Sequence, residues 1–252
     1  MYRERRCGIA GAVLWTRASP ADADTVRVLP DGCLDLIWSS RSGLLVAGPD
    51  RRAHLGPDEP GQWWVGLRLP PGVGPAVLGV PADELRDRRV PLADLWGAGP
   101  ADRVAASAVG APPRPVGGDP GRWPGSVRPP VDLGRVARAL EAVAVDRLHR
   151  ADGPDPVGLR VAASLATGTS VAATAAEVGL DARALHRRCR RLFGYGPKTL
   201  ARILRMRRAL AMARTGTPLA EVAARAGYAD QAHLGRDVRD LAGVPPRVLL
   251  GR

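Results

Sequence analysis

Apolar residues recur at two different spacings along the chain, and the first spacing covers the N-terminal part. Short apolar runs at 33–38, 44–47 and 63–69 are each bounded by glycine or proline. Runs of this length between turn formers are typical of β-strands. The pattern predicts a small antiparallel sheet or barrel up to about residue 96, with a helix start at 80–85 where proline precedes two acids.

The second spacing is helical and begins after a segment rich in proline and glycine. Residues 97–130 contain too much of both to form the interior of an element, so we expect a loose connection there. Apolar residues then recur with a helical period over 133–148. This predicted helix either closes the first domain or bridges to the second.

From residue 157 almost to the end the pattern is helical, and it contains an internal repeat. Residues 181–197 align with 230–246 at an offset of 49, and residues 175–179 align with 223–227 at an offset of 48. Each copy reads as an alanine-rich helix, a glycine turn and a second helix with Asp181 or Asp230 as its N-cap. The repeat therefore predicts a helix-turn-helix that is present twice.

The net charge of +12 is concentrated at the C-terminal end. Residues 157–252 carry 17 Lys+Arg against 6 Asp+Glu, whereas the rest of the chain is nearly neutral. A concentrated positive field attracts polyanions, so nucleic acid is the expected partner. No apolar run approaches the roughly 18 residues of a membrane-spanning helix, and glycine and arginine interrupt any signal-peptide core. We therefore expect a cytoplasmic protein without membrane contact.

The second helix of the first copy pairs an apolar stripe with a basic face. Leu185, Cys189 and Leu192 recur at helical spacing and are expected to enter the core. The opposite face carries side chains that can bond to guanine edges or phosphates. These side chains are Arg183, His186, Arg187 and Arg190.

The same face of the second copy is poorer in functional groups. It combines Ala232 and Gly235 with Arg236 and Arg239, and Gln231 lies at its border. We therefore expect the first helix to supply most of the sequence discrimination and the second mainly to anchor phosphates.

A helix predicted from Pro197 to about Arg214 joins the two copies. Its roughly 18 residues span about 27 Å, less than the ~34 Å between successive major grooves on one face of straight DNA. Two helices carried on this rod would enter adjacent grooves by splaying or by bending the duplex. Lys198 at its start is a further candidate for DNA contact, and Thr217 is expected to cap the next helix.

Residues from about 157 to 252 resemble the DNA-binding region of the AraC/XylS family of transcriptional regulators. The resemblance rests on residues 175–179, 185–189, 194–197, 207–210, 227–236 and 243–246. It implies two helix-turn-helix subdomains on a linker helix, and it implies that DNA is faced by Arg183, His186, Arg187, Gln231 and Arg236. Cys189 and Val238 stand where the family usually has phenylalanine, an exchange that costs packing in the core.

The N-terminal part is similar to the uncharacterised sensor-like domain that precedes this region in many such regulators. The similarity rests on residues 29–32, 47–49, 66–72, 78–81 and 92–96. It implies a cupin-like or related β-rich fold for effector binding or dimer contact. Tryptophans concentrate here, and most of them are expected to form the core. The candidates for an effector pocket are Trp38, Trp64 and Arg68.

The sequence thus predicts an α+β chain in three parts. Residues 1–130 are a β-rich sensor or regulatory domain, residues 131–156 are a helix and linker, and residues 157–252 are an all-α double helix-turn-helix domain. The predicted function is sequence-specific transcriptional regulation through double-stranded DNA. A small-molecule effector, a homodimer and, for an activator, RNA polymerase are the further candidate partners.

Two other functional classes stay open. The first is a DNA-repair or modifying enzyme, since some proteins with this DNA-binding region repair alkylated DNA through a zinc-held cysteine. Such a site needs a cysteine cluster, which Cys7, Cys33 and Cys189 are too scattered to form. The second is a protein-interaction adaptor that binds DNA without reading its sequence. Catalytic and cofactor motifs are missing from the sequence, so we expect no enzyme activity, no cofactor and no metal.

Overall fold

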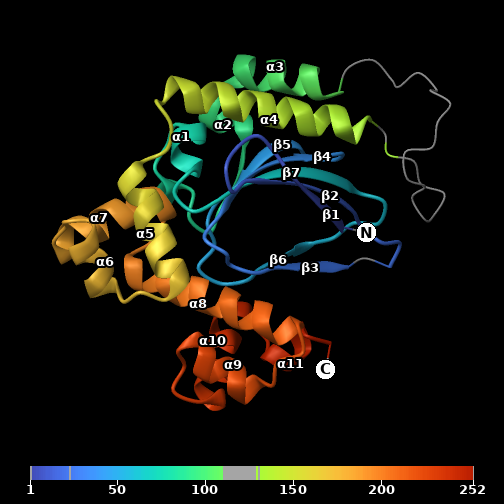
Figure 1. The fold of residues 1–252 in the computed structure, drawn as a ribbon. Coiled ribbons are helices and arrows are strands. Elements are labelled where there is room, and N and C mark those ends of the chain that lie inside the picture. The colour runs from blue at the N-terminus through green and yellow to red at the C-terminus, as the bar shows by residue number, and fades with distance from the viewer. Residues whose placement is uncertain (1, 23, 110–128, 130, 252) are drawn as a thin grey trace.

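The chain folds into a β-rich N-terminal domain followed by a helical C-terminal domain (Figure 1), which confirms the predicted fold class. The computed structural model describes residues 2–22, 24–109, 129 and 131–251. Its strands are β1 Tyr2–Arg6, β2 Val13–Ala18, β3 Thr25–Val28, β4 Leu34–Ser39, β5 Gly43–Ala47, β6 His54–Pro57, β7 Trp63–Leu69 and β8 Arg89–Pro91.

The helices of the N-terminal half are α1 Gly74–Leu78, the 3-10 turn η1 Ala82–Glu84, α2 Leu92–Trp96, α3 Ala98–Val109 and α4 Leu133–Arg150. The C-terminal half contains α5 Pro156–Thr167, α6 Val171–Glu177, α7 Ala182–Phe193, α8 Pro197–Arg214, α9 Leu219–Ala226, α10 Gln231–Ala242 and α11 Pro246–Leu249. The helix start expected at 80–85 is therefore only the one turn of η1.

Six strands form one antiparallel sheet in the order β1-β2-β7-β4-β5-β8, and β3 pairs with β6 in a separate ribbon. Along β4 and β7, side chains alternate between the two faces of this sheet. Leu34, Leu36 and Trp38 point into the main core, which α1 to α4 complete on the same side (Figure 1). Trp15 and Ile37 pack in a smaller cluster on the opposite face. The predicted strands at 33–38, 44–47 and 63–69 are confirmed.

The expected loose connection over 97–130 is wrong for its first third. Residues Ala98–Val109 form α3, because Ala101, Val104 and Ala108 recur at helical spacing and are buried in the main core. Pro100 is tolerated because it lies in the first turn, where the amide donors lack helical partners. The remainder, at 110–128 and 130, lies outside the described residues.

The helix predicted over 133–148 is α4, and it closes the N-terminal domain. Asp132 caps it by accepting hydrogen bonds from the amides of Gly134 and Arg135. Val136 and Leu140 are buried in the same core as the sheet. Of the two roles left open by the sequence, this is therefore the first.

The C-terminal helices enclose a second core, and α8 runs through it from one helix-turn-helix to the other (Figure 1). Leu200, Ile203 and Met206 are completely buried along α8. The predicted span of this helix is confirmed at Pro197–Arg214. The expected Thr217 cap is wrong, because α9 begins after Pro218 and has no side-chain cap. Across the described part of the chain, helices are too short or too polar to cross a bilayer.

Candidate nucleic-acid interface

The two helix-turn-helix units are α6 with α7 and α9 with α10, and their second helices are built alike. Asp181 caps α7 by accepting from the amide of Ala184, and Asp230 caps α10 by accepting from the amide of His233. Each helix has 12 residues and ends at a left-handed glycine, Gly194 or Gly243. Glycine adopts this conformation without a Cβ penalty, so both copies stop at the same repeat position.

The apolar stripes of both second helices enter the C-terminal core as predicted. Leu185 and Cys189 are each only 1% exposed, and Val238 is fully buried in the second copy. Burial raises the pKa of the Cys189 thiol to about 12, so this side chain acts as a small core residue. The exchanges at Cys189 and Val238 are therefore accommodated inside the core.

The opposite face of α7 is turned to solvent. Arg183, His186, Arg187 and Arg190 are all exposed. Among the described residues, Arg190 alone of these four forms an ion pair, with its Nη2 3.0 Å from Asp83 Oδ2 in the N-terminal domain. Within the described part of the chain, the Arg183 and Arg187 guanidiniums have no ion pair or hydrogen bond, so both are free to bind an external acceptor.

On α10 the side chains of Gln231, Arg236 and Arg239 are likewise exposed. Within the described residues, these three side chains form no hydrogen bond and no ion pair. Lys198 is exposed at the start of α8, between the two units. The structure therefore leaves all of the predicted DNA-facing cations at the surface.

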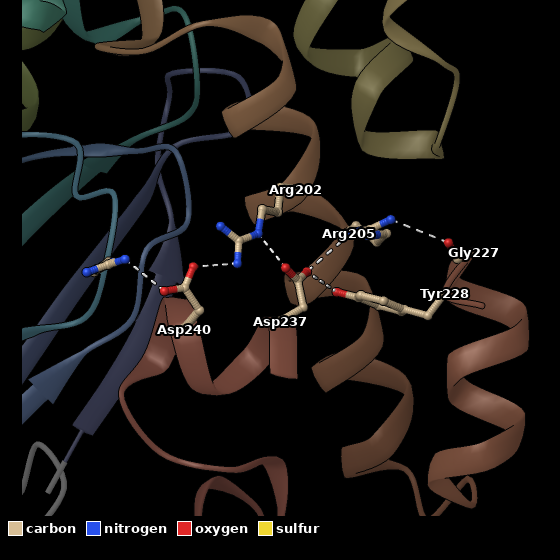
Figure 2. Close-up of polar contacts among 7 residues, drawn as sticks. Arg202, Arg205, Gly227, Tyr228, Asp237 and Asp240 are labelled. Atoms are coloured by element: carbon tan, nitrogen blue, oxygen red, sulfur yellow. Dashed lines mark hydrogen bonds and ion pairs between the residues drawn. The ribbon is translucent and has the colours of Figure 1, made fainter. Parts of the chain in front are cut away.

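A buried acid that the sequence reasoning missed holds α10 against α8. Asp237 is 6% exposed, and its carboxylate accepts from Arg202 Nε and from the Tyr228 hydroxyl at 2.9 Å (Figure 2). Arg205 Nη2 lies 3.4 Å away, and its guanidinium stacks on the Tyr228 ring at 4.2 Å. A buried carboxylate requires such partners to offset its lost hydration.

The sequence did contain a signal for this network. At the offset of 49, Asp237 aligns with Arg188 and Asp240 aligns with Arg191, so the repeat reverses charge at these two positions of the second helix. Arg188 forms its ion pair with Asp155 at the cap of α5, with Nη2 2.6 Å from Oδ2. The second helix of each unit is thus anchored by charge, but to a different neighbour.

The C-terminal end of α10 is also held by the N-terminal domain. Arg27 Nη1 donates to the carbonyl of Ala242 at 2.7 Å, and the amide of Ala53 donates to the carbonyl of Leu241 at 2.7 Å. Asp240 bridges the domains because it accepts from Arg52 at 2.8 Å and from Arg202 at 2.6 Å. The hydrogen bond from Arg202 lowers the pKa of Asp240, which keeps this carboxylate ionised.

The C-terminal end of α7 is held in a similar manner. Arg86 Nη1 donates to the carbonyl of Gly194 at 2.9 Å, and Asp83 pairs with Arg190 as described above. Cations near a helix C-terminus interact favourably with its exposed carbonyls. The N-terminal domain therefore contacts both α7 and α10 at their C-terminal ends.

The candidate effector residues do not lie together. Trp64 and Arg68 project from β7 on the sheet face away from the helices, whereas Trp38 is buried in the helix-covered core. Trp15 and Asp35 lie on the same face as Trp64 and Arg68, and Trp15 Nε1 donates to Asp35 at 2.6 Å.

Arg68 is the electrostatic centre of that face. Its guanidinium lies 3.5 Å from carboxylate oxygens of Glu4, Asp31 and Asp35. Burial raises the pKa of Asp35, while the charge of Arg68 opposes this rise. Acids therefore outnumber cations around Arg68.

Two family models match separate parts of the chain. Residues 159–252 match a helix-turn-helix domain of AraC type, and residues 12–91 match a domain of unknown function, DUF6597. No curated protein matches the chain.

Several solved structures are similar to parts or all of it. A probable AraC family transcriptional regulator from Rhodopseudomonas palustris is 23% identical, with 39% of this chain and 97% of that chain covered and a TM-score of 0.35. ToxT from Vibrio cholerae is 10% identical, with 99% and 98% covered and a TM-score of 0.49. A ToxT structure described as bound to an unsaturated fatty acid is 9% identical, with 98% and 97% covered and a TM-score of 0.47.

Proposed function

We propose, on the premise that this chain is a DNA-binding transcriptional regulator with an AraC-type helix-turn-helix domain, that α7 and α10 enter successive major grooves of one duplex. The observation that carries the proposal is the exposure of both basic helix faces on units that α8 joins. The 18 residues of α8 correspond to about 27 Å at the usual rise. The two helices then splay, or they bend the duplex, to reach grooves ~34 Å apart.

In this proposal α7 makes most of the contacts with bases, and α10 makes mainly phosphate contacts. On α7, Arg183, His186 and Arg187 supply hydrogen-bonding groups to base edges. On α10, Arg236 and Arg239 bind phosphates and Gln231 supplies the main base contact. The alanine and glycine positions of the second face support this division, because they have no side-chain group with which to read a base.

The N-terminal domain modulates DNA binding through its contacts with both recognition helices. Arg190 belongs to the DNA-facing set, yet its guanidinium is paired with Asp83 of that domain. An effector that shifts η1 would change the availability of Arg190. Trp64 and Arg68, joined by Trp15 and Asp35, are the residues proposed to contact the effector. The acidic surroundings of Arg68 favour an effector without a carboxylate at that point.

Further partners follow from the function. A homodimer would place four recognition helices on an operator, and an activator of this kind would contact RNA polymerase. A regulator of bacterial genes works in the cytoplasm, where the chromosome lies. The proposal assigns no catalytic step to the chain.

The experiment is selection of binding sites from random duplex DNA with the full chain. We expect a motif with two parts one helical turn apart, in which the part read by α7 is the more constrained. Footprinting of Arg187→Ala and Arg236→Ala on the selected duplex assigns each part to its helix. Selection that returns no motif, with equal affinity for scrambled DNA in moderate salt, would identify the non-specific adaptor instead. A motif more constrained under α10 would reverse the division of work.

A further inference from the structure

A groove separates the two helix-turn-helix units, and basic side chains line it. It is bounded by the α5–α6 connection of the first unit, by one face of α8, and by the turn of the second unit at Ala226 and Gly227. The cations that line it are Lys198, Arg202, Arg205 and Arg208. Aspartate and glutamate do not occur among the residues described as its lining.

Three of the four cations are held in place by the fold. Arg208 Nη1 donates to the carbonyls of Leu165 and Ala166, at 3.3 and 2.7 Å. Arg202 and Arg205 are positioned by Asp237, as Figure 2 shows. Because these guanidiniums are fixed before any ligand arrives, binding an anion there costs little side-chain entropy.

The remaining cation, Lys198, is exposed and is not held by the fold. The described structure gives its ammonium group no hydrogen bond and no ion pair. Asp237 and Asp240 neutralise part of the charge of Arg202 and Arg205, but Lys198 and Arg208 have no carboxylate partner in the described residues. A positive surplus therefore remains in the groove, and an anion would compensate it.

The position of the groove indicates which anion it takes. Two adjacent major grooves on one face of a duplex are separated by the minor groove with its phosphate strands. In a helix-turn-helix the first helix crosses the DNA backbone and the N-terminal end of the second meets the bases. The groove lies between the start of α6 and the turn that leads into α10, so it lies between two DNA-facing edges.

We propose that this groove binds a phosphodiester of the DNA backbone, the one that runs between the two major grooves read by α7 and α10. The inference rests on the proposed function, since it requires both helices to contact one duplex. Lys198 and Arg202 contact the phosphate oxygens, and Arg208 adds charge from the groove wall. Such a contact adds affinity without sequence preference and fixes the position of the linker helix on the duplex.

The test compares Lys198→Gln with Arg214→Gln in the full chain. Arg214 is an exposed cation at the other end of the same helix and does not line the groove. Affinity for a random-sequence duplex is measured by fluorescence anisotropy over a series of salt concentrations. Log affinity falls as log salt concentration rises, and loss of one phosphate contact makes this slope shallower by about 0.9. Relative to 1 M salt, this corresponds to a loss of about eightfold in affinity at 0.1 M salt.

We expect this change for Lys198→Gln and no change for Arg214→Gln. Equal slopes for Lys198→Gln and the unmodified chain, or equal losses in both variants, would overturn the proposal. On a duplex selected with the full chain, ethylation of one phosphate between the two parts should weaken the unmodified chain more than Lys198→Gln, which retains only the Arg202 contact with that phosphate. Because the salt series uses random DNA, it still reads out the groove if selection returns no motif.

A free phosphate ligand is the other source of the same chemistry. Thermal unfolding is followed by circular dichroism with and without inorganic phosphate. Stabilisation of the unmodified chain but not of Lys198→Gln, together with an unchanged DNA salt slope, would assign the groove to a free ligand and overturn the backbone assignment.

Discussion

The two helix-turn-helix units share a backbone plan and differ in what surrounds it. Both recognition helices begin at an aspartate cap and end at a left-handed glycine, and both bury an apolar stripe. The first exposes hydrogen-bonding side chains along its whole outer face, whereas the second has Ala232 and Gly235 at two of these positions. The duplicated frame is therefore compatible with unequal reading of DNA.

The means of support differ as well. At one repeat position, Arg188 of the first unit forms a half-exposed pair with Asp155, while Asp237 of the second is buried among Arg202, Arg205 and Tyr228. The second unit is consequently more dependent on its polar network. The first gains additional apolar support from Phe193, which aligns with the much smaller Ala242.

The largest expected effect is on the free energy of unfolding, where loss of Asp237 and loss of Arg188 should differ. Asp237→Ala should lower the free energy of unfolding by about 3 kcal/mol, because two guanidiniums and a hydroxyl lose a buried acceptor. Arg188→Ala breaks a half-exposed pair and should cost no more than about 1 kcal/mol. Urea denaturation followed by circular dichroism at 222 nm measures both. Similar losses in the two variants would show that the units are supported equally.

The second largest effect concerns the recognition of DNA sequence by α7 and α10. Arg187→Ala should weaken binding to the selected duplex by about 1–3 kcal/mol more than to random DNA, because a base contact is lost. Arg236→Ala, at the equivalent position of α10, should weaken both duplexes alike. Anisotropy titrations at one fixed salt concentration provide the comparison. Identical profiles for the two variants would contradict the division of work between the helices.

The smallest effect concerns the contacts with the N-terminal domain. Arg27→Ala removes the cation at the end of α10 and should cost about 0.5–1 kcal/mol, a typical value for a charge at a helix C-terminus. The Ala53 amide, which bonds to the neighbouring carbonyl of Leu241, should then exchange hydrogen about twofold to fivefold faster. Arg86→Ala acts at α7 and serves as the matched control. If Arg86→Ala accelerates hydrogen exchange at the Ala53 amide as much as Arg27→Ala does, the attachments of α7 and α10 open together.

Much of the C-terminal domain could be predicted from the sequence, because its signals are local. The caps Asp181 and Asp230, the terminal glycines and the span of α8 all follow from residues adjacent in the chain. The α3 helix was missed because proline and glycine at the two ends of 97–130 masked the helical spacing of Ala101, Val104 and Ala108.

The polar network and the domain contacts could not be predicted in this way. Asp237 meets Arg202 across 35 residues, and Arg27 meets Ala242 across 215 residues. Periodicity assigns a residue to a face of its helix but does not say which distant segment covers that face. For the same reason Trp38 was grouped with Trp64 and Arg68, although alternation along the sheet places it on the other side.

One attachment between the domains is made by main-chain atoms alone. The bond from the Ala53 amide to the Leu241 carbonyl does not depend on the identity of either side chain. Only proline at position 53 would delete the donor. Substitutions at the surface of either domain can therefore remove the arginine contacts one by one, while α10 keeps this main-chain hydrogen bond to the N-terminal domain. Within the described residues, the N-terminal domain holds α7 through the side chains of Arg86 and Asp83 and through no main-chain hydrogen bond, so mutation can uncouple the two units separately.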